Sequence, residues 1–249
     1  MMRETTVFGP IFSRRLGSSL GINLLPERGK ICNFDCIYCE CGWNKDGRGD
    51  THLPSAEEVR KALEAKLSAC ARDGTPIDSI TFSGDGEPTL NPDFAAIVDL
   101  TLSLRDRYYP AARVSVLSNA TRLDREDVFQ ALRRVDNPIL KIDAPTDEGA
   151  RKMNRPAGDY HVEDIVRNLE RFEGAFILQT MFLKGDGWSS ADWVEEWMNL
   201  VRRLHPREVM VYTLDRETPQ KGLEKYTVDE MRALVRPLIE EGYQLQIKG

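Results

Sequence analysis

The chain alternates short runs rich in β-branched residues with longer amphipathic runs, and this alternation limits the folds open to it. Short apolar runs are typical of buried parallel strands, and the longer runs have the periodicity of helices that cross back over a sheet. The pattern predicts strands at residues 21–25, 79–83, 113–118, 139–143, 176–182, 209–213 and 244–247, and helices at residues 56–71, 92–108, 125–134, 162–172, 190–204 and 228–241. Six strand–helix units are too few for a closed eightfold barrel. The sequence therefore predicts an open, partial (β/α)6 barrel with a parallel sheet and outer helices.

No internal repeat, low-complexity tract or flexible linker divides the chain. We expect a single domain over residues 1–249, in which residues 1–19 are an N-terminal extension and residues 20–249 form the partial barrel. Glycines around residues 43–53 predict an irregular loop there. Arginines on the predicted helices, such as Arg134 and Arg203, are expected on the outer, solvated face.

The composition is that of a globular protein, with 41% hydrophobic and 30% charged residues. No window approaches the ~18 apolar residues of a membrane-spanning helix, and the first residues contain no apolar signal block. We therefore expect a cytoplasmic protein without a membrane partner. The formal net charge of −6 argues against broad nucleic-acid binding.

Four of the five cysteines lie within ten residues, which indicates metal ligation in a reducing compartment rather than disulfides. Cys32, Cys36 and Cys39 form a C-x3-C-x2-C arrangement. Three thiolates at this spacing can hold three irons of a cubane cluster and leave the fourth iron open. The alternative is a structural zinc ion, which needs a fourth ligand from Cys41 or His52, and no second ligand pair follows.

A glycine-containing turn, SGDGEP, follows the second predicted strand. Gly84 and Gly86 let the backbone approach a ligand closely and adopt positive φ, and Glu87 can accept a hydrogen bond from an ammonium group. Asp85 and Pro88 complete the turn. An ordinary strand-to-helix turn would also account for the glycines.

The cysteine motif resembles the signature of the radical S-adenosylmethionine (SAM) superfamily. The resemblance implies that the three cysteines hold a [4Fe-4S] cluster whose open iron is chelated by the methionine part of SAM. It also implies that Tyr38, which precedes the third cysteine, lies against the adenine. SGDGEP resembles the Gly-Gly-Glu-Pro element of the same family, which binds the amino group of SAM.

The stretches FGPIFSRRLGSSLGINLLP, CNFDCIYCE and SGDGEPTL together resemble a subgroup of compact radical SAM oxidoreductases related to the wyosine-forming tRNA enzymes. This likeness extends over about the whole chain in order. No cysteine follows Cys70, so the auxiliary clusters of many peptide-modifying relatives are not expected.

The later predicted strands end in polar residues, and the carboxyl ends of barrel strands face the mouth of the active site. The resemblance implies SAM contacts from Ser118, Asn119, Asp143 and Gln179, although each could also be an ordinary strand-end cap. We expect substrate or catalytic roles for four further residues near these ends: Lys141, Arg155, Asp215 and Arg216.

Basic residues in the mouth loops predict an anionic substrate, because guanidinium groups bind carboxylates and phosphates well. They are Arg14, Arg15, Arg151, Lys152, Arg155, Lys184 and Arg216. Acidic residues of the same loops offer them partners instead, namely Asp147, Glu148, Asp186, Asp215 and Glu217.

The resemblance implies an enzyme that cleaves SAM reductively and abstracts hydrogen from an unidentified substrate, with electrons from a donor such as flavodoxin or ferredoxin. One alternative is a wyosine-type tRNA-modifying enzyme, which the charge of −6 and the absence of a long basic insertion disfavour. The other is a non-catalytic zinc-binding interaction module.

Overall fold

The structure is a computed structural model that describes residues 5–13, 16–47, 49–185 and 188–249. The chain forms two compact units, each built from several separate segments. The N-terminal unit consists of the described residues of Met1–Cys32, Asn44–Ser118 and Arg122–Pro138. The C-terminal unit consists of Asn33–Trp43, Asn119–Thr121 and the described residues of Ile139–Gly249. The prediction of a single domain stays a prediction.

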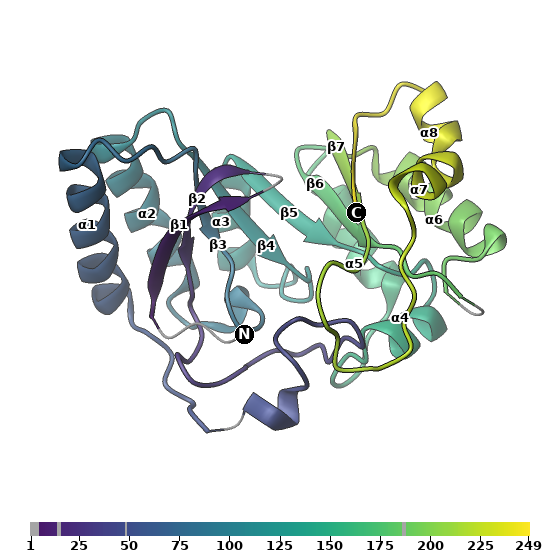
Figure 1. Cartoon of the computed structure of the whole chain (residues 1–249), viewed down its shortest axis with the longest axis horizontal. Coiled ribbons are helices and arrows are strands. Elements are labelled where there is room, and N and C mark those ends of the chain that lie inside the picture. Colours follow the sequence, from purple (N-terminus) through teal and green to yellow (C-terminus); the bar gives the residue numbers. More distant parts are fainter. Residues whose placement is uncertain (1–4, 14–15, 48, 186–187) are drawn as a thin grey trace. The chain divides into compact units, whose positions relative to one another are not determined.

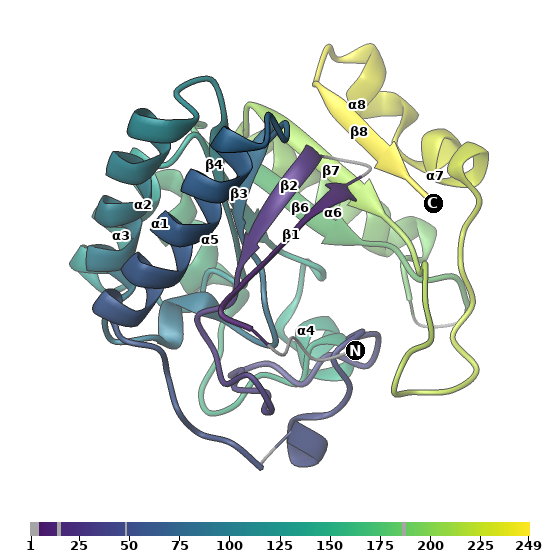
Figure 2. The same cartoon turned by 60° about the vertical axis from the view of Figure 1, so that its left-hand side comes forward.

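The strands of the N-terminal unit hydrogen-bond in the order in which they follow along the chain. They are β1 (Val7–Ser13), β2 (Gly17–Ile22), β3 (Ser79–Phe82) and β4 (Arg113–Ser118). β1 is antiparallel to β2, whereas β2, β3 and β4 are parallel. Three helices lie together beside these strands, as Figures 1 and 2 show: α1 (Ala56–Arg72), α2 (Phe94–Tyr108) and α3 (Glu126–Arg134). Two short 3-10 helices, η1 (Asn44–Gly47) and η2 (Pro88–Leu90), lie in the loops.

The two faces of this sheet differ in chemistry because successive strand residues point to opposite sides. Phe82 of β3 packs edge-on against Phe94 of α2, with ring centroids 6.1 Å apart. The residues of β3 on the other face, Ser79 and Thr81, carry hydroxyl groups. The Ser79 side chain lies 3.0 Å from that of Thr81 and 3.1 Å from that of Ser115 on β4. All three are buried, so the polar face is satisfied by its own hydrogen bonds.

The C-terminal unit contains the last three residues of β5 (Asn137–Lys141), followed by β6 (Ile177–Met181), β7 (Glu208–Tyr212) and β8 (Leu245–Lys248), all parallel. Its helices are α4 (Asp147–Met153), α5 (Val162–Glu170), α6 (Ala191–Leu204), α7 (Val228–Leu234) and α8 (Arg236–Glu240). Figure 2 shows α7 and α8 beside β8. Trp197 of α6 is fully buried, stacks on Trp193 and contacts Phe182 edge-on, which anchors α6 on the sheet.

The predicted elements are confirmed, with differences that have local causes. β1 was not expected, because Gly9 and Pro10 interrupt its pattern, and β2 begins at Gly17 instead of residue 21. The helix predicted at residues 228–241 is divided before Pro237, which has no N–H to continue the first helix. α4 was also not expected, because seven residues are too few for a clear helical periodicity.

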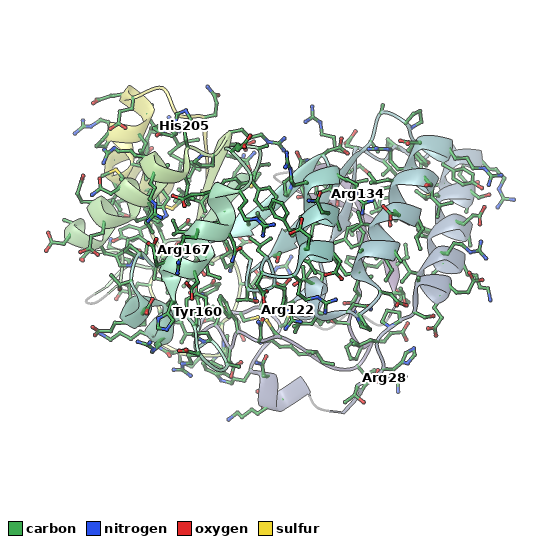
Figure 3. All side chains as sticks on the ribbon, turned by 180° about the vertical axis from the view of Figure 1, so that it is seen from behind. Arg28, Arg122, Arg134, Tyr160, Arg167 and His205 are labelled. Atoms are coloured by element: carbon green, nitrogen blue, oxygen red, sulfur yellow. The ribbon has the colours of Figure 1, made fainter. Side chains whose placement is uncertain are left out.

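The helix arginines lie on a partly exposed surface and pair with acidic side chains, and this pairing was not predicted. Figure 3 labels Arg134, on α3, and Arg167, on α5, in the view from behind. Arg134 forms an ion pair of 2.6 Å with Asp99, and Arg203 of α6 forms one of 2.8 Å with Glu163. No helix among the described residues is long and apolar enough to cross a membrane.

Candidate active site

The cysteine loop, residues 32–41, is held by backbone hydrogen bonds within each unit. In the C-terminal unit Cys39 N donates to Cys36 O at 3.1 Å, so these two cysteines belong to one turn. Asp35 N and Ile37 N donate at 2.8 and 3.0 Å to the carbonyls of Asn154, directly after α4, and of Met153, the last residue of α4. The middle of the loop is therefore fixed against the end of α4.

Cys32 begins the loop in the N-terminal unit, and its carbonyl accepts a hydrogen bond of 3.0 Å from the Asn44 side chain. The preceding residue, Ile31, forms a bridge with the SGDGEP turn: Ile31 N donates to Asp85 O at 3.2 Å, and Glu87 N donates to Ile31 O at 3.0 Å. The two motifs predicted to bind the cluster and SAM are thus joined through Ile31.

All five cysteines are thiols without disulfides, so Cys32, Cys36 and Cys39 have the donor chemistry that an iron–sulfur cluster requires. Burial raises the pKa of the Cys36 thiol, and the charge of Lys141 opposes that shift. Within the described part of the chain no three His, Cys, Asp or Glu side chains converge on a single metal ion. A cubane needs no such convergence, because each thiolate binds a different iron. The residues present therefore fit a cluster with one open iron.

A buried polar network lies against the middle cysteine. Lys141 Nζ donates to the Tyr38 hydroxyl at 2.5 Å, and that hydroxyl donates to Asp143 Oδ2. Asn154 Nδ2 lies 2.6 Å from Asp143 Oδ2 and 3.4 Å from Cys36 Sγ. These side chains come from three segments, namely the cysteine loop, the end of β5 and the residue after α4, and the carboxylate of Asp143 connects them.

The protonation states in this network follow from burial and charge. Burial and then the charge of Asp143 raise the pKa of Tyr38 well above its usual value, so the phenol keeps its proton. Burial alone would lower the pKa of Lys141, but Asp143, Tyr212 and Cys36 together outweigh burial and raise that pKa. The Asp143 side chain has no exposed surface, and its Oδ1 accepts a hydrogen bond of 2.9 Å from Met181 N. Both carboxylate oxygens therefore already have protein donors.

The SGDGEP turn is built around close backbone contacts in the N-terminal unit. Gly86 has a φ of +141°, and a Cβ there would lie 1.9 Å from the Ile31 carbonyl oxygen. A Cβ on Gly84 would lie 2.0 Å from Asn23 Oδ1, which accepts a hydrogen bond of 3.3 Å from Asp85 N. Both glycines are therefore required by neighbouring protein atoms.

Glu87 follows these glycines and is 2% exposed. Its Oε1 accepts hydrogen bonds from the Thr89 hydroxyl at 2.6 Å and from Ser118 Oγ, at the end of β4, at 2.8 Å. Two predicted SAM contacts, Glu87 and Ser118, are thus brought together. Pro88 opens η2.

The other predicted SAM contacts lie in the C-terminal unit. Asn119 Nδ2 donates to the side chain of Asn33, within the cysteine loop, at 2.7 Å, and Asn119 Oδ1 accepts from the Thr121 hydroxyl at 2.7 Å. Gln179 is buried in β6. Asn119 therefore lies beside the cysteine loop, and its contact with SAM stays a prediction.

The predicted substrate residues have partners other than those expected. The Arg155 guanidinium lies 4.6 Å from the centre of the Trp43 ring and donates to the Gln220 side chain at 3.2 Å. Arg216 pairs with Glu40 at 3.1 Å, not with Asp215. Asp215 and Arg216 line a pocket of about 350 Å³ in the loop after β7, together with Leu214, Glu217, Thr218, Lys221, Gly222, Leu223 and Lys225.

Among the other mouth residues, Lys152 pairs with Glu148 and Lys184 with Glu230. Arg14, Arg15 and Asp186 lie outside the described residues. Asn23, Asn33 and Asn154 were not predicted from the sequence, because their roles depend on contacts with distant segments and leave no local pattern.

The comparison with family models identifies the group to which these motifs belong, because residues 27–198 match the model of the radical SAM superfamily. The chain belongs to the radical SAM superfamily. The match includes both the cysteine loop and the SGDGEP turn, and it confirms the resemblance predicted from them.

One curated relative is similar over most of the chain. The UPF0026 protein of Methanocaldococcus jannaschii is 30% identical over 224 residues, which are 87% of this chain and 66% of the relative. The chain thus spans about two thirds of that relative's length.

Solved structures of radical SAM proteins confirm the fold class, a partial (β/α)6 barrel. The Streptococcus suis protein SuiB bound to S-adenosylmethionine matches with a TM-score of 0.65 at 14% identity, over 89% of this chain and 49% of SuiB. TYW1 with a bound lysine–pyruvate adduct matches with a TM-score of 0.66 at 15% identity, over 92% of this chain and 76% of TYW1.

Proposed function

We propose that this radical SAM protein is an enzyme that holds a [4Fe-4S] cluster through Cys32, Cys36 and Cys39, cleaves SAM reductively and abstracts hydrogen from its substrate. One observation carries the proposal. The cysteine loop keeps its three thiols and is fixed at its start to Gly86 and in its middle to the end of α4. A loop held at both places can keep a ligand set in position before the cluster binds.

The bound cluster and SAM supply the radical chemistry, and the protein supplies position and exclusion of water. The Glu87 carboxylate is oriented by Thr89 and Ser118 for an ammonium group such as that of SAM. The backbone of Gly84, Asp85 and Gly86 directly precedes Glu87 in the same turn. Tyr38, buried beside Cys36, keeps water from that side of the loop.

The test is metal and sulfide analysis after anaerobic reconstitution. We expect about four irons and four sulfides per chain, and 5′-deoxyadenosine formation once a one-electron reductant is added. Cys36→Ala should abolish cluster retention, whereas Cys70→Ala, which changes a cysteine outside the loop, should not. One zinc per chain without sulfide would show instead a zinc-binding module.

For the substrate we propose an anion bound near Arg155 and Arg216. The support is that the Arg155 guanidinium lies over the Trp43 ring and that Arg216 borders the pocket after β7. A thermal-shift screen of phosphorylated and carboxylated small molecules, with wild type and both Ala variants, tests this. A ligand that stabilises all three proteins equally would contradict the anchoring roles.

A second candidate is a wyosine-type tRNA-modifying activity, and the observation that supports it is the fold similarity to TYW1. The test is binding of bulk tRNA at two salt concentrations, since phosphate contacts weaken steeply with salt. We further propose a cytoplasmic location. We also propose that flavodoxin or ferredoxin supplies the electrons, which pull-down with the reduced donors would test.

A further inference from the structure

Asn154, directly after α4, connects the cysteine loop to the buried Asp143. Its carbonyl accepts the hydrogen bond of 2.8 Å from Asp35 N. Its side-chain Nδ2 lies 2.6 Å from Asp143 Oδ2, 3.3 Å from the Tyr38 hydroxyl oxygen and 3.4 Å from Cys36 Sγ. The residue is 2% exposed, so water does not compete for these contacts.

The chemistry of its neighbours fixes the orientation of the Asn154 amide. An amide nitrogen only donates and an amide oxygen only accepts, and both the carboxylate and a thiolate are acceptors. Turning the amide over would place Oδ1 against two acceptors. Asp143 is itself held by Met181 N at 2.9 Å, so the surroundings permit only the orientation in which Nδ2 donates.

We propose that Asn154 is a positioning residue for Cys36: one N–H of its amide donates to Sγ and favours the reduced state of a cluster bound there. This inference rests on the proposed function. Reduction adds one electron from an external one-electron donor, and no covalent bond forms or breaks. The added negative charge spreads onto the sulfurs, so a donor to sulfur stabilises the reduced cluster more than the oxidised one.

The side chain and the backbone of Asn154 act separately, which makes the inference testable. A substitution at 154 removes the N–H to sulfur but keeps the backbone bonds from Asp35 and Ile37 to Asn154 and Met153. Asn154→Leu has similar size and no donor. The control is Asn168→Leu, since the Asn168 side chain on α5 lies away from the cysteine loop and contacts Asp164 O and, at 3.4 Å, the Arg171 guanidinium just beyond the helix.

The experiment is an EPR-monitored titration of the reconstituted full chain with dithionite, without substrate. In Asn154→Leu the equilibrium constant for one-electron reduction should fall about tenfold, which is a potential about 59 mV more negative. Asn168→Leu should match wild type. The Fe–S(Cys) stretching bands of wild type should also shift in D2O, and those of Asn154→Leu should shift less.

A full cluster with wild-type potential in Asn154→Leu would overturn the inference. Should that variant fail to fold, Asn154→Gln and Asn154→Met provide the comparison at equal length, with and without a donor. The inference then requires a more negative potential in the Met variant, and equal potentials refute it. Wild-type protein that binds no cluster would refute the proposed function itself, a distinct result.

Discussion

Gly86→Ala should disturb the cysteine loop, because Gly86 lies directly against Ile31, the residue before Cys32. A Cβ at this position would be 1.9 Å from the Ile31 carbonyl oxygen, and real Cβ contacts do not fall below 3.0 Å. Ile31 would therefore have to move by about 1 Å or more, which breaks the bond from Glu87 N and pulls on the adjacent Cys32.

The cost follows from two contributions. A non-glycine residue at a φ of +141° costs about 1 to 3 kcal/mol. The two backbone hydrogen bonds of Ile31 contribute about 1 kcal/mol each. We expect a loss of about 3 to 5 kcal/mol in the free energy of unfolding, or roughly 10 °C in Tm for a chain of this size.

Gly74→Ala is the matched control. Gly74 also has positive φ, +66°, but a Cβ there would meet nothing within 4 Å. It should cost only the conformational strain, about 1 to 2 kcal/mol. Thermal melts of both apoproteins and the iron content after reconstitution are the measurements, and Gly86→Ala should lose iron while Gly74→Ala keeps it. Equal Tm losses with full iron in both variants would refute the reasoning.

Three further outcomes are expected. Asp143→Asn leaves the Lys141 ammonium without its carboxylate and should cost about 3 to 5 kcal/mol in urea unfolding, and adding Lys141→Met should recover part of it. No recovery would contradict the pairing. The hydrogen bond to Asp147 raises the pKa of His161, so NMR should find it titrating above its usual 6.5 and Asp147→Asn should lower it. Because that pKa is raised, the interaction stabilises the fold fully below about pH 6.5 and is lost as the pH rises through the folded-state pKa. Arg216→Ala should change the free energy of unfolding by at most about 1 kcal/mol, since its pair with Glu40 is exposed; a larger loss would show a structural role.

The sequence by itself determined the order of strands and helices and the two motifs. Periodicity is a local property, so residues 113–118 predicted β4 with its exact bounds. The spacing of Cys32, Cys36 and Cys39 and the glycines of SGDGEP are equally local. The matched family model covers both motifs.

Only the tertiary structure decided what the individual site residues contact. The sequence placed Lys141 and Asp143 at one strand end, but their common partner, Tyr38, is more than a hundred positions away. Asn154 and Cys36 are 118 positions apart, and Asn154 follows a helix too short to predict. A hydrogen bond between distant segments depends on how the chain packs, and burial then makes each unpaired donor or acceptor costly, so packing selects the partners that no local pattern records.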